Sequence, residues 1–152
     1  MTARSSRDWL AELVSFDTTS RTSNLALIDR VEAFLQGLGA DTERTVSADG
    51  EKANLHAVLG PKAEGGVVLS GHTDVVPVDG QAWTSDPFTL TERGGRLYGR
   101  GSCDMKGFIA CALAAAPRFA ASDLKRPVHF ALSYDEEVGC IGAPAMIERM
   151  SK

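Results

Sequence analysis

The chain has 152 residues, 43% of them hydrophobic and 24% charged, proportions typical of a globular protein with one sizeable core. Its net charge is −4 with no block of like charges, so the charge pattern supports neither a nucleic-acid nor a membrane partner. The lack of a long apolar run argues against a transmembrane helix or a signal peptide, and three cysteines without a C-x-x-C pair fit reduced thiols, so we expect a cytoplasmic protein.

The first third of the chain predicts two amphipathic helices. Apolar residues recur at helical spacing in two stretches, 9–16 and 27–38, and the polar stretch between them predicts a loop. Ser5 and Asp8 are spaced to cap the first helix, and Gly39 is placed to end the second. Both helices read as packing elements without chemistry of their own.

Beyond residue 53, short apolar runs bounded by glycine and proline alternate with an alanine-rich run. The short runs are typical of strands buried in a sheet, and the alanine-rich run predicts a helix. Strands that alternate with helices indicate the α/β class, so we expect a three-layer α/β/α sandwich with a mostly parallel central sheet. The predicted strands are 54–59, 66–70, 88–92, 96–98 and 127–133, and the predicted helices are 106–121 and 144–150.

Three polar motifs each follow a predicted strand. They are Gly-His-Thr-Asp at 71–74, Gly-Arg-Gly-Ser-Cys-Asp at 99–104 and Asp-Glu-Glu at 135–137. In an open α/β sheet the carboxyl ends of the strands form the ligand-binding crevice. We therefore expect the three motifs to converge in space, although they lie far apart in the sequence.

The residue types in these motifs suit a divalent metal. One imidazole with several carboxylates is a donor set for zinc or cobalt. His72 and Asp74 stand two residues apart, so both side chains point the same way on an extended segment, and Asp74 could accept the second ring N–H or steady an attacking water. Asp104 lies in a glycine-flanked turn from which one carboxylate could bridge two cations. Of Glu136 and Glu137, one could bind metal while the other takes a proton.

Each motif taken alone has an ordinary structural interpretation. An isolated H-x-D is usually a polar pair in a loop, a run of three acidic residues is usually solvated, and an aspartate after Gly-x-Gly usually belongs to a turn or a helix cap. All three motifs follow buried apolar strands, where an unpaired carboxylate is costly, and this favours a site. Cys103 is an alternative ligand or nucleophile, but no histidine lies near it in the sequence.

Other candidate sites are disfavoured. His56 and His129 fall inside predicted strands without an acidic neighbour, so we expect structural histidines. The glycines at 93–101 match no phosphate-binding loop, and no serine lies in a G-x-S-x-G motif, which argues against a serine hydrolase.

The three motifs, in order, resemble those of the di-zinc metallopeptidase family that includes acetylornithine deacetylase, succinyl-diaminopimelate desuccinylase, aminoacylase and glutamate carboxypeptidase. The resemblance is carried by residues 70–80 with Trp83, by 96–107 and by 133–140. The third motif and the opening at 16–29 have the form found in the acetylornithine deacetylase branch.

The resemblance implies a role for each candidate residue. His72 would bind one metal, Glu137 would bind the other, and Asp104 would bridge the two. Glu136 would be the general base, and Asp74 would support His72. The implied cofactor is two Zn²⁺ ions per complete site, with Co²⁺ as a possible replacement, and family members carry a cis peptide after the bridging aspartate.

The resemblance also implies an activity and an incomplete site. The expected reaction is deacetylation of N-acetylornithine to ornithine and acetate in arginine biosynthesis, with succinyl-diaminopimelate desuccinylase, a broader aminoacylase or a non-catalytic truncated domain as alternatives. Residues 1–152 would be the N-terminal part of the catalytic domain, without the inserted dimerisation domain and the C-terminal part. We expect the full-length enzyme to be a homodimer that acts on a small N-acyl amino acid. This chain alone should be inactive, because each metal keeps only two protein ligands.

Overall fold

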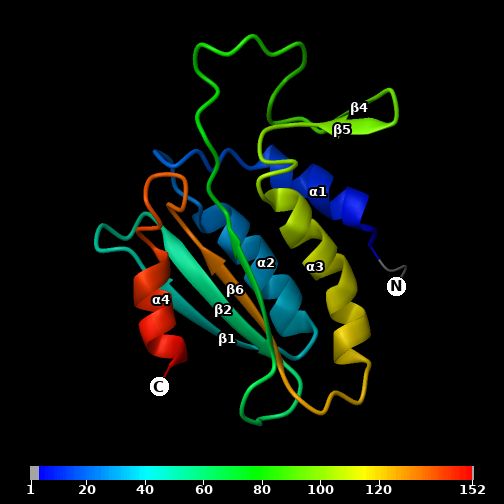
Figure 1. Ribbon diagram of the computed structural model, residues 1–152, viewed down its shortest axis with the longest axis vertical. Helices are drawn as coiled ribbons and strands as arrows, with labels where there is room; N and C mark the ends of the chain where they lie inside the picture. Colours follow the sequence, from blue (N-terminus) through cyan, green and yellow to red (C-terminus); the bar gives the residue numbers. More distant parts are fainter. Residues whose placement is uncertain (1–3, 152) are drawn as a thin grey trace.

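A computed structural model of the protein describes residues 4–151, which form a three-layer arrangement of helices around a central sheet (Figure 1). The sheet contains four strands in the order β1-β2-β6-β3, and a separate hairpin pairs β4 with β5. The helices are α1 (Ser6–Ser15), α2 (Leu25–Gly37), α3 (Lys106–Ala120) and α4 (Ala143–Met150). The strands are β1 (Asp41–Val46), β2 (Ala53–Leu59), β3 (Val67–His72), β4 (Thr91–Arg93), β5 (Arg96–Tyr98) and β6 (Val128–Ser133).

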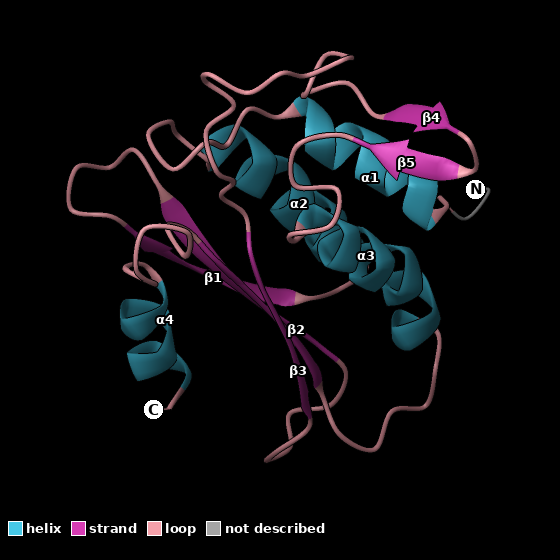
Figure 2. Cartoon of the chain, turned by 45° about the horizontal axis from the view of Figure 1, so that its top comes forward, coloured by secondary structure: helices cyan, strands magenta, loops and turns pink. Residues whose placement is uncertain are grey.

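The two faces of the sheet are covered unequally. Alternate residues of β2, such as Leu55 and Ala57, are fully buried and belong to the core with the apolar stripe of α2. Helix α1 packs on α3 on this side, whereas α4 lies across β1, β2 and β6 on the opposite face (Figure 2). The α/β class and the three layers predicted from the sequence are therefore confirmed.

Within the described residues the sheet is mixed rather than mostly parallel. Strands β3 and β6 run parallel, but β1 with β2 and β2 with β6 are antiparallel. The sequence prediction omitted β1, which the turn at residues 47–52 folds back against β2. Strand β1 lies at the edge of the sheet and its side chains are exposed or half-buried, so it lacks the apolar run that reveals a buried strand.

A second difference concerns the strand predicted at 88–92. The carboxylate of Asp86 accepts hydrogen bonds from the Phe88 backbone N–H and the Thr89 hydroxyl, at 2.9 and 2.8 Å. This turn keeps residues 86–89 out of the strand, so β4 begins only at Thr91 and pairs with β5. The helix limits were predicted well, because the Ser5–Asp8 capping box begins α1 and Gly39, with a φ of 86°, follows the end of α2.

The parallel pair β3–β6 fixes where two of the polar motifs emerge. His72 at the end of β3 is in register with Ser133 at the end of β6, so the segments that follow both strands leave the same edge of the sheet. No helix in residues 4–151 is long and apolar enough to cross a membrane.

The start of α3 is anchored by a buried lysine. Lys106 is fully buried, and its Nζ donates a 2.7 Å hydrogen bond to the backbone oxygen of Phe16, which joins α3 to the loop after α1. Burial lowers the pKa of Lys106 to about 8, although the nearby Asp17 carboxylate opposes the shift.

This buried lysine predicts how stability changes with pH. Between pH 8 and the ordinary lysine value of 10.5, the unfolded chain keeps a proton that the folded chain has released. The free energy of unfolding should therefore rise with pH across this window, by on the order of 3 kcal/mol. Urea denaturation at several pH values should show that Lys106→Met removes this rise, whereas Lys125→Met, at an exposed position, keeps it. The same slope in all three proteins would contradict the assignment.

Candidate metal centre

His72 is the buried centre of the candidate site. It is the last residue of β3, and its side chain is 5% exposed. Its Nδ1 lies 3.0 Å from the backbone oxygen of Asp74, and its Nε2 lies 3.0 Å from Oδ1 of Asp104. Burial disfavours the charged ring, but hydrogen bonds with the carboxylates of Asp74 and Asp104 outweigh it and raise the pKa of His72 to about 9. The imidazole is therefore held between acceptors on both sides.

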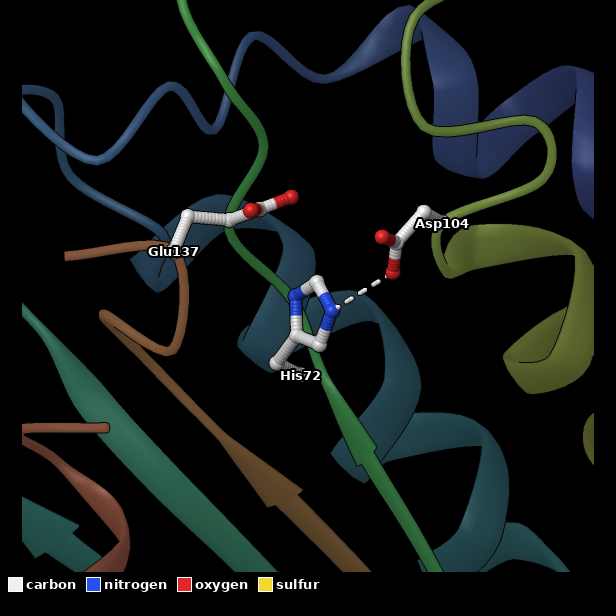
Figure 3. Close-up of side chains that lie close together, drawn as sticks. All are labelled: His72, Asp104 and Glu137. Atoms are coloured by element: carbon white, nitrogen blue, oxygen red, sulfur yellow. Dashed lines mark hydrogen bonds and ion pairs between the residues drawn. The ribbon is translucent and has the colours of Figure 1, made fainter. Parts of the chain in front are cut away.

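Two carboxylates from distant segments converge on this ring. Asp104 comes from the turn before α3, and Glu137 comes from the loop after β6 (Figure 3). One ligand atom each from His72, Asp104 and Glu137 lies within 4.8 Å of the other two. The convergence predicted from the sequence is confirmed for these three residues.

The route by which Asp104 reaches the site differs from the prediction. Strand β5, which precedes it, belongs to the separate hairpin and not to the central sheet. Asp104 is instead placed by the turn at 99–104, where Gly101 has a φ of 76° and an added Cβ would lie 2.6 Å from a Val75 methyl group. The peptide bond between Asp104 and Met105 is cis, as the family resemblance implied.

The electrostatics of this group favour a cation. Burial raises the pKa of Glu137, and the neighbouring Asp104 carboxylate raises it further because two like charges face each other. A divalent ion between the two carboxylates and the imidazole would remove this repulsion. One nitrogen and several oxygens match the ligand preference of zinc, while Cys103 is exposed and does not belong to the group.

Asp74 is a buried residue next to His72 that holds other parts of the site in place. It is 2% exposed, and its carboxylate accepts hydrogen bonds from the backbone N–H groups of Glu136 and Glu137, at 3.0 and 3.2 Å, and from the Ser20 hydroxyl at 2.8 Å. Burial alone would raise its pKa, but the hydrogen bonds with His72 and these donors lower the pKa of Asp74 below its usual range. The carboxylate thus joins β3 to the loop that carries both glutamates.

The predicted contact between Asp74 and His72 is present in a different form. The ring Nδ1 is closer to the backbone oxygen of Asp74 than to its carboxylate, which lies 3.5 Å away. No sequence feature predicted that this carboxylate would accept hydrogen bonds from the amides of the two glutamates. The role of Ser20 was also not predicted, although this residue lies in the stretch 16–29 that carries part of the family resemblance.

Glu136 lies beside the group of three without joining it. Its Oε2 is 3.8 Å from Nε2 of His72, and its side chain is 44% exposed. The Cys140 thiol donates a long hydrogen bond of 3.7 Å to its other oxygen. Glu137 therefore belongs to the ligand group, while the partly exposed Glu136 carboxylate lies beside it, near His72.

The two remaining histidines lie apart from the site. His56 on β2 and His129 on β6 stack on each other, with Nε2 of one 3.0 Å from Nδ1 of the other. Burial and the neighbouring ring lower the pKa of His56. Neither belongs to the ligand group, in agreement with the structural role expected from the sequence.

The comparisons with known proteins agree with this geometry. A family model described as Peptidase family M20/M25/M40 matches residues 68–152, which contain all three motifs. Human carnosine dipeptidase 1 has the same fold with a TM-score of 0.81 and 29% identity, over 95% of this chain and 34% of that one. The M20 family metallo-carboxypeptidase Sso-CP2 of Sulfolobus solfataricus gives a TM-score of 0.79 over 96% of this chain and 34% of that one, and at 24% identity it shows the fold alone.

Two curated relatives that the chain resembles share one activity name. The chain is 49% identical over 147 residues to the acetylornithine deacetylase of Myxococcus xanthus, covering 93% of this chain and 38% of the relative. It is 44% identical over 128 residues to the acetylornithine deacetylase of Proteus mirabilis, covering 84% of this chain and 33% of the relative. The chain therefore spans well under half of each relative's length.

The contacts of Asp74 lead to a mutational prediction. In Asp74→Asn one carboxylate oxygen becomes an NH₂ group, which cannot accept from the N–H and O–H donors that surround it. We expect a loss of about 1–3 kcal/mol in the free energy of unfolding, measured by urea denaturation. Asp79→Asn is the matched control, because Asp79 is exposed and forms an ion pair with the exposed Arg21 on the surface. Equal losses in both variants would contradict the role of Asp74.

Proposed function

The chain belongs to peptidase family M20/M25/M40, and on that premise we propose that it forms part of a metal-dependent hydrolase that deacetylates N-acetylornithine to ornithine and acetate. The observation that carries the proposal is the convergence of His72, Asp104 and Glu137 to within 4.8 Å, with the Glu136 carboxylate beside them. The acetylornithine deacetylase relatives support the choice of substrate.

The residues present fit a bound metal. His72 would hold one Zn²⁺ and Glu137 a second, with Asp104 between them, and Co²⁺ would suit the same donors. Bound there, the metal would lower the pKa of a water molecule and polarise the amide carbonyl. Despite the burial of its ring, the neighbouring carboxylates raise the pKa of His72, and burial followed by the Asp104 charge raises the pKa of Glu137. A bound cation would balance the carboxylate charge in both cases.

Glu136 is the residue proposed to move the proton. It would accept a proton from the attacking water and pass it to the leaving amine. Its exposed side chain can reach a bound substrate, while its backbone N–H is fixed by the buried Asp74 carboxylate. Asp74 would orient both the His72 ring and the Glu136–Glu137 pair.

The rest of the functional unit is proposed to lie outside these residues. Three ligand side chains are too few for two catalytic zinc ions, each of which normally has three protein ligands. We place residues 1–152 in the N-terminal part of a catalytic domain that is completed by a further acidic ligand, a histidine ligand and a dimerisation domain. The full-length protein would be a cytoplasmic homodimer in arginine biosynthesis, and the 152-residue chain alone would be inactive.

A substrate panel tests the proposed reaction. The full-length protein loaded with Zn²⁺ or Co²⁺ should release acetate from N-acetylornithine with a kcat/KM at least about tenfold above that for N-succinyl-diaminopimelate or other N-acetyl amino acids. Preference for the succinyl substrate would reassign the protein to desuccinylation. Equal rates on many acyl amino acids would indicate a broad aminoacylase.

The two glutamates should respond differently to the same substitution. Glu136→Gln keeps the shape but cannot accept a proton, so kcat should fall by about 10²-fold or more while metal content is unchanged. Glu137→Gln should instead reduce the bound metal. Turnover and metal analysis of the full-length variants measure both effects, with the exposed Glu51→Gln as the control. The reverse pattern would exchange the two roles.

A further inference from the structure

The loop at 134–142 carries both glutamates, and its shape depends on an unusual backbone. Asp135 adopts a φ of 54° and Cys140 a φ of 57°, in the left-handed region that non-glycine residues seldom occupy. Inside the loop, the backbone oxygen of Glu136 accepts from two N–H groups and that of Asp135 from one. These local bonds shape the turn, but they do not fix it relative to His72.

Lys52 provides an anchor from the other side of the site. It precedes β2, and its Nζ donates to both carboxylate oxygens of Asp135, at 2.6 and 2.7 Å. The same ammonium group donates to the backbone oxygen of Ser20. The side chains of Lys52 and Asp135 are only 15% and 13% exposed, so this ion pair is shielded from water far more than a surface pair.

The position of Lys52 is set by its own turn. Its backbone N–H donates to the Ser47 hydroxyl at 2.9 Å, and its backbone oxygen accepts from the Ser47 N–H at 2.8 Å. The β1–β2 turn lies next to the loop after β6 in Figure 1. The hairpin therefore holds the backbone of Lys52 independently of the contact between its ammonium group and Asp135.

Asn54, two residues further along, closes the same loop at both ends. It is fully buried on β2, its side-chain oxygen accepts from the Tyr134 N–H at 3.1 Å, and its side-chain NH₂ donates to the Gly142 backbone oxygen at 2.8 Å. The segment 52–54 thus holds the beginning, the end and the left-handed Asp135 of the glutamate loop.

Ser20 links the contacts of Lys52 to the buried carboxylate of Asp74. Ser20 accepts from Lys52 through its backbone oxygen and donates to Asp74 through its hydroxyl. Asp74 in turn accepts the N–H groups of Glu136 and Glu137. Lys52 is accordingly linked to the position of the two glutamates by two routes, one through Asp135 and one through Ser20 and Asp74.

We propose that Lys52 is a positioning residue of the metal centre, which holds Asp135 in its left-handed conformation and thereby presents Glu136 and Glu137 to the site. Lys52 does not belong to the group of His72, Asp104 and Glu137, so its role is to position and not to bind. The consequence for catalysis rests on the proposed function, whereas the consequence for the loop does not. A residue that supports metal ligands in this way typically changes metal affinity by about 10- to 100-fold when it is removed.

Hydrogen–deuterium exchange on the metal-free full-length protein tests the loop directly. In Lys52→Met, the peptide that covers 134–142 should take up deuterium about tenfold faster, while the peptide that covers β2 is unchanged. Lys62→Met is the matched control, because Lys62 is 92% exposed and lies away from the site. Faster exchange in both peptides, or in neither, overturns the proposal.

A second variant keeps the test decisive if Lys52→Met does not fold. Asp135→Asn preserves the side-chain shape and a residue type that tolerates the left-handed region, but it loses the charge that Lys52 binds. It should accelerate exchange in the same peptide alone. Lys52→Arg, which keeps the cation, should restore part of the protection, and failure of Asp135→Asn to change the loop overturns the proposal.

Zinc titration and turnover add readouts that simple destabilisation does not produce. In Lys52→Met the Kd for Zn²⁺ should rise at least about tenfold, and kcat should fall with little change in KM, while Lys62→Met matches the parent protein. Unchanged zinc affinity in a folded Lys52→Met overturns the proposal. An absence of deacetylation in every variant, with the exchange and zinc effects present, would reject the proposed function alone.

Discussion

A buried carboxylate that must be stabilised by hydrogen bonds organises this end of the molecule. Asp74 is almost completely removed from water, and its charge is stabilised by His72, by an amide from each glutamate and by one hydroxyl. The amides and the hydroxyl come from the loop after β6 and the loop after α1. The hydrogen bonds of this one side chain therefore bring together three segments that are distant in the sequence. They also help to place the glutamates that follow β6 next to His72.

The same group of charges favours a cation at the candidate site. His72 is held between acceptors, and its pKa is raised to about 9, while Glu137 is pushed toward its neutral form by burial and by Asp104. A divalent ion bound to these atoms would compete with protons for them, so it would bind more tightly as pH rises.

A residue of the candidate site could be predicted from the sequence when it follows a buried strand. His72 and Glu137 were predictable because β3 and β6 are neighbours and the loops after parallel strands leave one edge. Asp104 was placed correctly by resemblance, but its strand belongs to another sheet, and a glycine-controlled turn delivers it instead. The proposed role of Lys52 could not be predicted for two reasons. Its position depends on the turn after the edge strand β1, whose polar sequence does not indicate a strand, and its partner Asp135 lies 83 residues further along the chain.

The residues of the site differ in burial, and this difference separates those that are held in place from those that can move. His72 and Asp74 are at most 5% exposed, whereas the side chains of Asp104 and Glu136 are 75% and 44% exposed. His72 is held at the end of β3, and Asp74 is held by hydrogen bonds from the loop after β6 and the loop after α1. The exposed carboxylates are open to solvent, so they can adjust to a group that binds there. Fixed, buried residues beside exposed carboxylates leave the ligand group open to further partners, unlike the closed ligand set of a structural metal site.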